Sequence, residues 1–222
     1  MVKLDQTAKE FLAYAEQYLD LDELKHEVDK LHKHNIGKGK EYIIKDLLEF
    51  IGEDPNREGL LETPSRVLKA WHEWTRGYRE DPDTVFKVFE DGAENYDTMI
   101  ILDGIPFHSH CEHHMASING VCHIGYIPNG KIAGLSKFAR LTNIYANRLQ
   151  VQERITTQIA DNIVKHLQPK GVAVVIKAEH ECMSSRGVRA HGVLTTTSAM
   201  RGVLIEESND ARNEFLSLIN SK

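Results

Sequence analysis

His108-Ser109-His110-Cys111-Glu112-His113-His114 places one thiol, one carboxylate and four imidazoles within a short stretch of the chain. These side chains bind zinc and similar metals, and imidazole also transfers protons near neutral pH. A second cluster of the same residue types, His180-Glu181-Cys182, lies far downstream. We expect both clusters to bind one zinc ion. The fold must therefore bring residues 108–114 and 180–182 close together.

The composition is typical of a globular protein. The 222 residues are 41% hydrophobic and 27% charged, which suits one large domain or one domain with an appended element. The formal net charge of −6 argues against broad nucleic-acid binding but allows a local basic pocket for an anion. No apolar run approaches the length of a membrane span, and the first residues lack the order of a secretion signal. We therefore expect a cytoplasmic protein with neither a membrane nor a nucleic-acid partner.

The cysteines are Cys111, Cys122 and Cys182. An odd number of cysteines in a reducing compartment is a poor basis for disulfides, so metal binding or catalysis is the better use for at least two of them. Cys122 lies outside both clusters, in a stretch with strand character, and is expected to pack in a sheet.

The order of the predicted elements indicates an α+β fold. Hydrophobic residues at helical spacing predict two helices within 3–34 and further helices over 42–51, 63–78, 136–149, 151–167 and 209–219. Strand character predicts strands over 98–102, 115–127, 171–182 and 193–205, with Asn119-Gly120 as a turn. Helices followed by strands, with a helical pair between the strands, indicate an antiparallel sheet covered by helices.

The spacing within each cluster predicts the local backbone conformation. Cys111 and His114 converge on a turn or helical bend, but they would face opposite sides of a straight strand. His180 and Cys182 lie two apart on a predicted strand and therefore share one face. Cys111, His114 and Cys182 would provide two thiolates and one imidazole, which leaves a fourth position open as in catalytic zinc sites. His113 and His180 would remain as general acid or base.

Other interpretations of the clusters stay open on the residues alone. The thiols would be inert if both were simply buried in the core, and the histidines would then belong to a structural site. Two separate clusters of ligand-type residues favour the metal-binding interpretation, because a Cys-x-x-His pair by itself is only moderately specific.

Basic residues at the start of the helix over 136–149 indicate an anion site. Ser136 is predicted to cap this helix, and a helix N-terminus presents free N–H groups and a positive dipole to phosphate. Lys137 and Arg140 lie on neighbouring positions of one helix face and would strengthen such a site. Arg186 adds a guanidinium close to the second cluster. The alternative is a solvated basic helix end.

Gln152-Glu153 opens the next helix. A carboxylate beside an amide is able to bind the N–H edge of a guanine. Such pairs are also common on helix surfaces, so the residues alone leave both interpretations open.

Several ordered motifs resemble those of the GTP cyclohydrolase I family. The resemblance covers roughly residues 40–220 and rests on Glu62-Thr63-Pro64-x-Arg66-Val67, Cys111-Glu112-His113-His114, Gly134-Leu135-Ser136-Lys137, Gln150-Val151-Gln152-Glu153-Arg154, His180-x-Cys182, Arg186-Gly187-Val188 and Asn213-Glu214-Phe215-Leu216. It implies the T-fold (tunnelling fold), an antiparallel four-stranded sheet with helices packed on one face, over residues 39–222. An N-terminal helical extension over 1–38 would precede this catalytic domain. The family also implies a toroidal homodecamer with active sites between subunits.

The resemblance implies an activity as well. The family hydrolyses GTP with one zinc ion per subunit, opens the imidazole ring at C8 and releases formate. It then recloses the product as 7,8-dihydroneopterin triphosphate, the first step of tetrahydrofolate and pterin biosynthesis. Zinc would activate the water that attacks C8.

Site residues carry over from the family position by position. The zinc ligands would be Cys111, His114 and Cys182, and the proton-transferring residues would be His113 and His180. Guanine would be bound by Gln152 and Glu153, and the triphosphate by Ser136, Lys137, Arg140, Arg186 and Arg66. Met115 departs from the family, which often has phenylalanine there, and this difference bears on packing more than on chemistry.

Three alternative assignments fit the sequence less well. Another enzyme of the same fold that binds a purine-like ring is disfavoured, because such relatives do not generally carry the Cys111, His114 and Cys182 set. A binding protein without activity is disfavoured by the retained His113 and His180. A zinc nucleoside deaminase is disfavoured because its Cys-x-x-Cys pair is absent. The sequence leaves open which pathway takes the product and whether a partner protein regulates it.

Overall fold

The computed structural model describes residues 37, 39–90, 96, 98–205 and 210–221. The chain groups into two compact units that adjoin in sequence between Glu73 and Trp74. The helices expected within 3–34 lie outside the described residues. The division into an extension over 1–38 and a domain over 39–222 therefore stays a prediction.

The described part of the first unit is helical. It contains α3 (Glu41–Phe50), the 3-10 helix η1 (Glu58–Leu60) and α4 (Thr63–Trp74), whose end reaches the second unit. Pro64 lies in the first turn of α4, where its missing N–H costs no hydrogen bond. None of the described helices combines the length and the apolar character that a membrane span requires.

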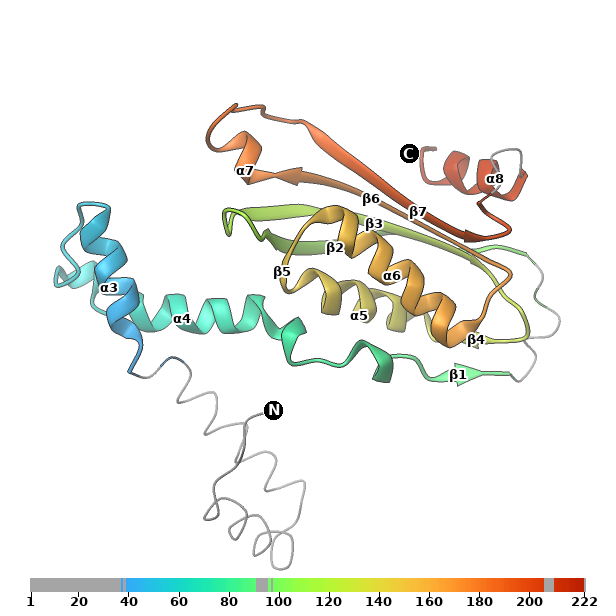
Figure 1. Ribbon diagram of the computed structural model, residues 1–222, viewed down its shortest axis with the longest axis horizontal. Helices are drawn as coiled ribbons and strands as arrows, with labels where there is room; N and C mark the ends of the chain where they lie inside the picture. The colour runs from blue at the N-terminus through green and yellow to red at the C-terminus, as the bar shows by residue number, and fades with distance from the viewer. Residues whose placement is uncertain (1–36, 38, 91–95, 97, 206–209, 222) are drawn as a thin grey trace, which may run out of the picture. The chain divides into compact units, whose positions relative to one another are not determined.

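The second unit is built on an antiparallel sheet (Figure 1). Its long strands are β2 (Ile100–Cys111), β3 (Ser117–Ile127), β6 (Gly171–His180) and β7 (Leu194–Gly202), and the short β5 (Leu149–Gln150) runs parallel to β2 at one edge. The order across the sheet is β5-β2-β3-β6-β7. The antiparallel arrangement expected from the sequence is confirmed for the four long strands, whereas the parallel edge strand β5 makes the sheet five-stranded and was not expected. A separate two-stranded sheet pairs β1 (Val88–Phe89) with β4 (Ile132–Ala133).

Two helices cover one face of the large sheet. These are α5 (Leu135–Ala146) and α6 (Gln152–Leu167), which lie side by side under the strands in Figure 1. The main core lies between the helices and the sheet, and its fully buried side chains include Ile118, Ile124, Tyr126, Phe138, Leu141, Ile155, Ile159, Ile163, Val172, Val174 and Ile176. Burial of each such side chain contributes roughly 1.5–3 kcal/mol, so the helix pair is held firmly against the strands.

The helices α5 and α6 pack on one face as expected, but the C-terminal helix α8 (Asp210–Leu218) lies on the opposite face, which the expectation did not include. The reason lies in β6, whose apolar run Gly171–Ile176 presents Ala173 and Val175 to the second face. Phe215 of α8 packs against these residues. A Cβ atom at Gly125 would lie 2.7 Å from the Phe215 ring, so glycine is needed for the helix to approach the sheet.

The turn expected at Asn119-Gly120 was also wrong. Both residues lie inside β3, where Gly120 pairs with Phe107 on one side and with Ala178 on the other. A Cβ atom at Gly120 would lie 2.3 Å from the carbonyl oxygen of Lys177. The glycine therefore serves close strand approach rather than a turn.

Candidate metal centre and active site

The turn between β2 and β3 carries the first half of the site. The N–H of Met115 donates to the carbonyl of Cys111 at 2.8 Å, and Met115 has a positive φ of 55°. The chain therefore bends at Cys111, as predicted from the spacing of Cys111 and His114. The bend brings Cys111 Sγ to 3.9 Å from His114 Nδ1.

The second half of the site comes from the end of β6. His180 lies opposite Ile118 in the β3–β6 pair, so it stands at the same end of the sheet as the β2–β3 turn (Figure 1). The strand ends at His180, and Glu181–Ser184 forms the single helical turn α7, which carries Cys182. The expectation that His180 and Cys182 share one face of a strand was therefore wrong, because the backbone becomes helical between them.

Three potential metal ligands converge where these halves meet. Sγ of Cys111, a ring nitrogen of His114 and Sγ of Cys182 all lie within 4.8 Å of one another. Ligand atoms around one tetrahedral zinc lie roughly 3.3–3.8 Å apart, given zinc distances of about 2.3 Å to sulfur and 2.0 Å to nitrogen. Two sulfurs with an imidazole suit zinc and are poor ligands for magnesium or calcium. His113 lies 3.7 Å from Cys111 Sγ but is not part of this group.

A cleft of about 180 Å³ opens beside the ligands. In the parallel pair of β2 and β5, Gln150 lies opposite Cys111, and this pairing brings the start of α6 against the metal group. The cleft is lined by Cys111, His113, Ile118, Gln150, Val151, Gln152, Glu153, His180 and Cys182. Residues assigned from the sequence to metal, proton transfer and guanine thus surround one space.

His180 and Gln152 form a hydrogen bond within this cleft, with 2.7 Å between His180 Nε2 and Gln152 Oε1. The side chain of Gln152 is buried between α6 and the sheet, whereas Glu153 is exposed. Burial lowers the pKa of His180, and the negative charge of Glu153 opposes that shift. The lowered pKa favours the neutral imidazole near neutral pH.

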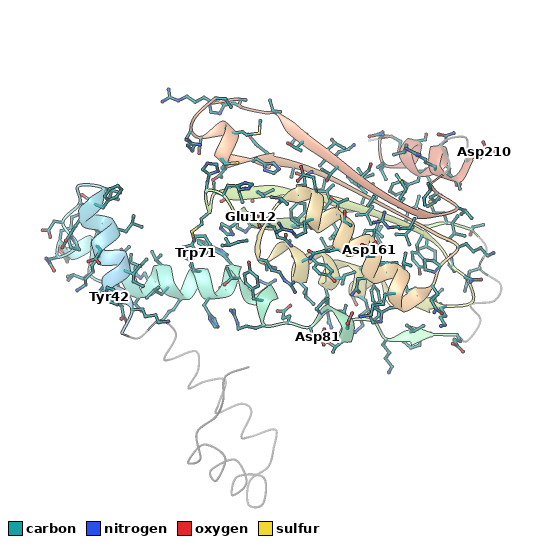
Figure 2. All side chains as sticks on the ribbon, in the orientation of Figure 1. Tyr42, Trp71, Asp81, Glu112, Asp161 and Asp210 are labelled. Carbon is teal, nitrogen blue, oxygen red and sulfur yellow. The ribbon has the colours of Figure 1, made fainter. Side chains whose placement is uncertain are left out.

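An ion pair between Glu112 and Arg154, which was not predicted from the sequence, joins the metal-binding turn to α6. Arg154 donates to both carboxylate oxygens of Glu112, at 2.6 and 3.1 Å, and these bonds lower the pKa of Glu112. The N–H of Glu112 also donates to the carbonyl of Gln150 at 3.0 Å. Figure 2 labels Glu112 at this end of the sheet. Both residues lie within the quoted motifs, but they are 42 positions apart in the sequence, and no local pattern predicts their pairing.

Lys137 and Arg140 line a different pocket of the same unit, about 460 Å³ in volume. It lies between α5 and the segment that contains η2 (Arg76–Tyr78) and η3 (Pro82–Thr84). Its lining comprises Arg76, Glu80, Asp81, Thr84, Val85, Lys137, Arg140, Asn143 and Ile144, and Asp81 is labelled in Figure 2. None of these residues lines the metal cleft.

The remaining predicted phosphate contacts are scattered. Ser136 does not cap α5, because the helix already begins at Leu135 after Gly134, and no side chain bonds to its end. Arg186 lies at the metal group, with Nη1 3.4 Å from His114 Nε2. Arg66 belongs to the first compact unit, where it forms an exposed ion pair with Glu62.

Comparison with known proteins gives a consistent picture. Residues 40–220 match the family described as GTP cyclohydrolase I. The GTP cyclohydrolase 1 of Janthinobacterium sp. is 54% identical over 176 residues, which cover 79% of this chain and 88% of that protein. The GTP cyclohydrolase 1 of Nitrosospira multiformis is 53% identical, covering 79% and 91%, and that of Mycobacterium tuberculosis is 50% identical, covering 81% and 88%. A solved structure of the archaeosine synthase QueF-Like aligns with 47% of this chain and 94% of its own, at 19% identity and a TM-score of 0.39.

Proposed function

Because this chain belongs to the GTP cyclohydrolase I family, we propose that it opens the imidazole ring of GTP at C8, releases formate and recloses the product as 7,8-dihydroneopterin triphosphate. The observation that carries the proposal is the convergence of Cys111, His114 and Cys182 beside a cleft that also holds His113 and His180. The product would feed tetrahydrofolate or pterin biosynthesis.

The metal proposed for this site is one zinc ion per subunit, held by Cys111, His114 and Cys182. The donor set supports zinc because thiolate sulfur with imidazole nitrogen is its preferred surrounding. A zinc ion held by these three residues would supply Lewis-acid activation of water.

The chain's own side chains would move the protons. His113 and His180 both line the cleft, His113 from the turn between β2 and β3 and His180 from the end of β6. We assign them as general acid and base, since imidazole accepts and donates protons near neutral pH. Glu153 is exposed at the cleft beside them and is assigned to the N–H edge of guanine.

The triphosphate is proposed to bind Lys137, Arg140, Ser136, Arg186 and Arg66. The pocket with Lys137 and Arg140 shares no lining residue with the metal cleft, which supports a site composed of the cleft from one subunit and the basic pocket from another. Within the described residues, the sheet also ends at β7 without a further strand, while β5 covers only His110 and Cys111 of β2. Two unlike open edges favour head-to-tail association, which closes into rings.

On this basis we propose the T-fold and a homodecamer with active sites between subunits. The ring would continue the antiparallel sheet from one subunit to the next through the edges of β2 and β7. The cytoplasm is the proposed location, because Cys111 and Cys182 serve as metal ligands only while reduced and the cysteines of the described chain form no disulfide.

The proposed reaction is tested by incubation of the purified, zinc-loaded protein with GTP. The expected product is a pterin triphosphate, which becomes fluorescent after oxidation. Binding of GTP without any pterin product would overturn the proposal.

A further inference from the structure

The amide of Gln152 is surrounded by polar groups of the chain itself. Its side chain is only 1% exposed at the start of α6. Nε2 lies 3.1 Å from the carbonyl oxygen of Ile176, 2.9 Å from that of Thr195 and 3.1 Å from the hydroxyl of Thr197. Oε1 lies 2.7 Å from Nε2 of His180. Both ends of the amide are therefore engaged inside the protein.

These partners decide which way the amide points. The carbonyl oxygens of Ile176 and Thr195 are acceptors only, so the atom that faces them must be the NH2 group. The amide oxygen of Gln152 is then the atom that faces His180. Because this oxygen only accepts, the hydrogen bond requires a proton on Nε2 of His180. In the neutral ring, Nδ1 is consequently the nitrogen that is free to accept a proton.

We propose that Gln152 is a positioning residue that holds the His180 ring in its Nε2–H tautomer, with Nδ1 as the working nitrogen. The sheet fixes the amide in turn, because Ile176 lies on β6 and Thr195 and Thr197 lie on the neighbouring strand β7. Thr156 of α6 adds to the network: its hydroxyl donates to the main-chain carbonyl of Gln152 at 2.7 Å and lies 2.7 Å from the hydroxyl of Thr197, which contacts the Gln152 amide.

This role deepens the proposed function and rests on it, since the imidazole is oriented for proton transfer to the GTP ring. It also differs from the role expected from the sequence, in which Gln152 and Glu153 bind the guanine edge together. Glu153 is exposed and free to do so, whereas the amide of Gln152 would first have to leave four partners.

A double-mutant cycle on kcat separates the roles. In an otherwise wild-type protein, Gln152→Leu is expected to lower kcat by about 10- to 100-fold, as loss of other partners that orient an imidazole does. It should leave KM for GTP and the zinc content unchanged. In a His180→Ala background the same substitution should lower kcat by less than about threefold, because its effect passes through the missing ring. Equal losses in both backgrounds would overturn the proposal.

A second measurement covers the case in which His180→Ala is too slow to follow. ITP lacks the 2-amino group of GTP, so Gln152→Leu should lower kcat for both nucleotides by the same factor, whereas Glu153→Gln should change their ratio. A changed ratio in Gln152→Leu would mean guanine contact and would overturn the proposal. Gln158→Leu, which removes an amide from the same helix without touching His180, is the matched control and should keep kcat within about twofold. Wild-type protein that makes no pterin would instead overturn the proposed function, and this inference with it.

Discussion

Cys111 of β2 lies directly opposite Gln150 of β5 in a parallel strand pair, and this short pairing decides what surrounds the metal group. Since α6 begins two residues after Gln150, the pairing sets Gln152 and Glu153 beside the ligands. The Glu112–Arg154 ion pair links the residue after Cys111 to the first turn of α6. The metal-binding turn and the start of α6 therefore form one assembly.

Removal of one thiol ligand should remove the metal. Cys182→Ser is expected to lose most of its zinc and, with it, GTP turnover, because the other two ligands cannot hold the ion alone. Zinc is measured by elemental analysis of the dialysed protein. The matched control is Cys122→Ala: Cys122 is buried in the sheet as expected, burial raises the pKa of its thiol to about 12, and its loss should leave the zinc content unchanged. Equal zinc and equal activity in Cys182→Ser and wild type would contradict the ligand assignment.

His113 should be needed for turnover and not for metal. The ring lies near Cys111 but outside the convergent group, so His113→Ala should retain zinc. Loss of a general acid or base is expected to lower kcat by about 10²- to 10⁴-fold. Zinc content and kcat are measured on the same preparation. If His113→Ala released its zinc, the assignment of His114 to metal binding and of His113 to proton transfer would be wrong.

Two defective variants should complement each other if the site joins two subunits. Cys182→Ser damages the metal cleft and Lys137→Ala damages the basic pocket, so each protein alone should be nearly inactive. In mixed oligomers from co-expression, up to about a quarter of the sites would combine two intact halves and recover activity. Each chain carries its own affinity tag, so that only mixed particles are assayed. Mixed particles as inactive as the parents would contradict a site that joins two subunits.

Asp83 should stabilise the second unit through α6. It binds Lys165, His166 (3.0 Å) and Asn162 (3.1 Å), and the bonds from Lys165 and His166 hold its pKa at about 2. The folded pKa is below the model-peptide value of 3.8, so the stabilisation is complete above that value and is lost as the pH falls toward 2. Asp83→Asn is expected to lower the urea midpoint at neutral pH, by an amount that shrinks in this acidic range.

The control for Asp83 is Glu80→Gln. Glu80 is about as exposed as Asp83, but it forms a single ion pair, with Arg76 at 3.5 Å, and one such pair contributes little to stability. Its midpoint should stay close to that of wild type at every pH. A midpoint for Asp83→Asn that also matched wild type throughout would contradict the stabilising role.

The parts of the site that follow from local spacing were predictable from the sequence. Cys111 and His114 had to lie on a bend to converge, and the bend is present. The antiparallel sheet followed from the order of strand and helix patterns. The turn predicted at Asn119-Gly120 was wrong, because the same dipeptide occurs both in hairpin turns and where two paired strands approach closely. Which of the two forms here depends on the carbonyl of Lys177 in the neighbouring strand β6.

The parts that depend on long-range pairing were not predictable. The partners of Gln152 come from β6 and β7, and no local pattern around Gln152 reveals them. The placement of α8 depended on which face of β6 presents Ala173 and Val175. Ser136 was assigned as a cap from its residue type, but the helix starts one residue earlier.

The most direct test of the proposed reaction follows the C8 atom itself. GTP labelled with ¹³C at C8 is incubated with the zinc-loaded protein and with the same protein stripped by a chelator, and formate is followed by NMR. We predict labelled formate and a pterin triphosphate in equal amounts from the loaded protein, and neither from the stripped protein. Loaded protein that binds GTP but releases no labelled formate would contradict the account.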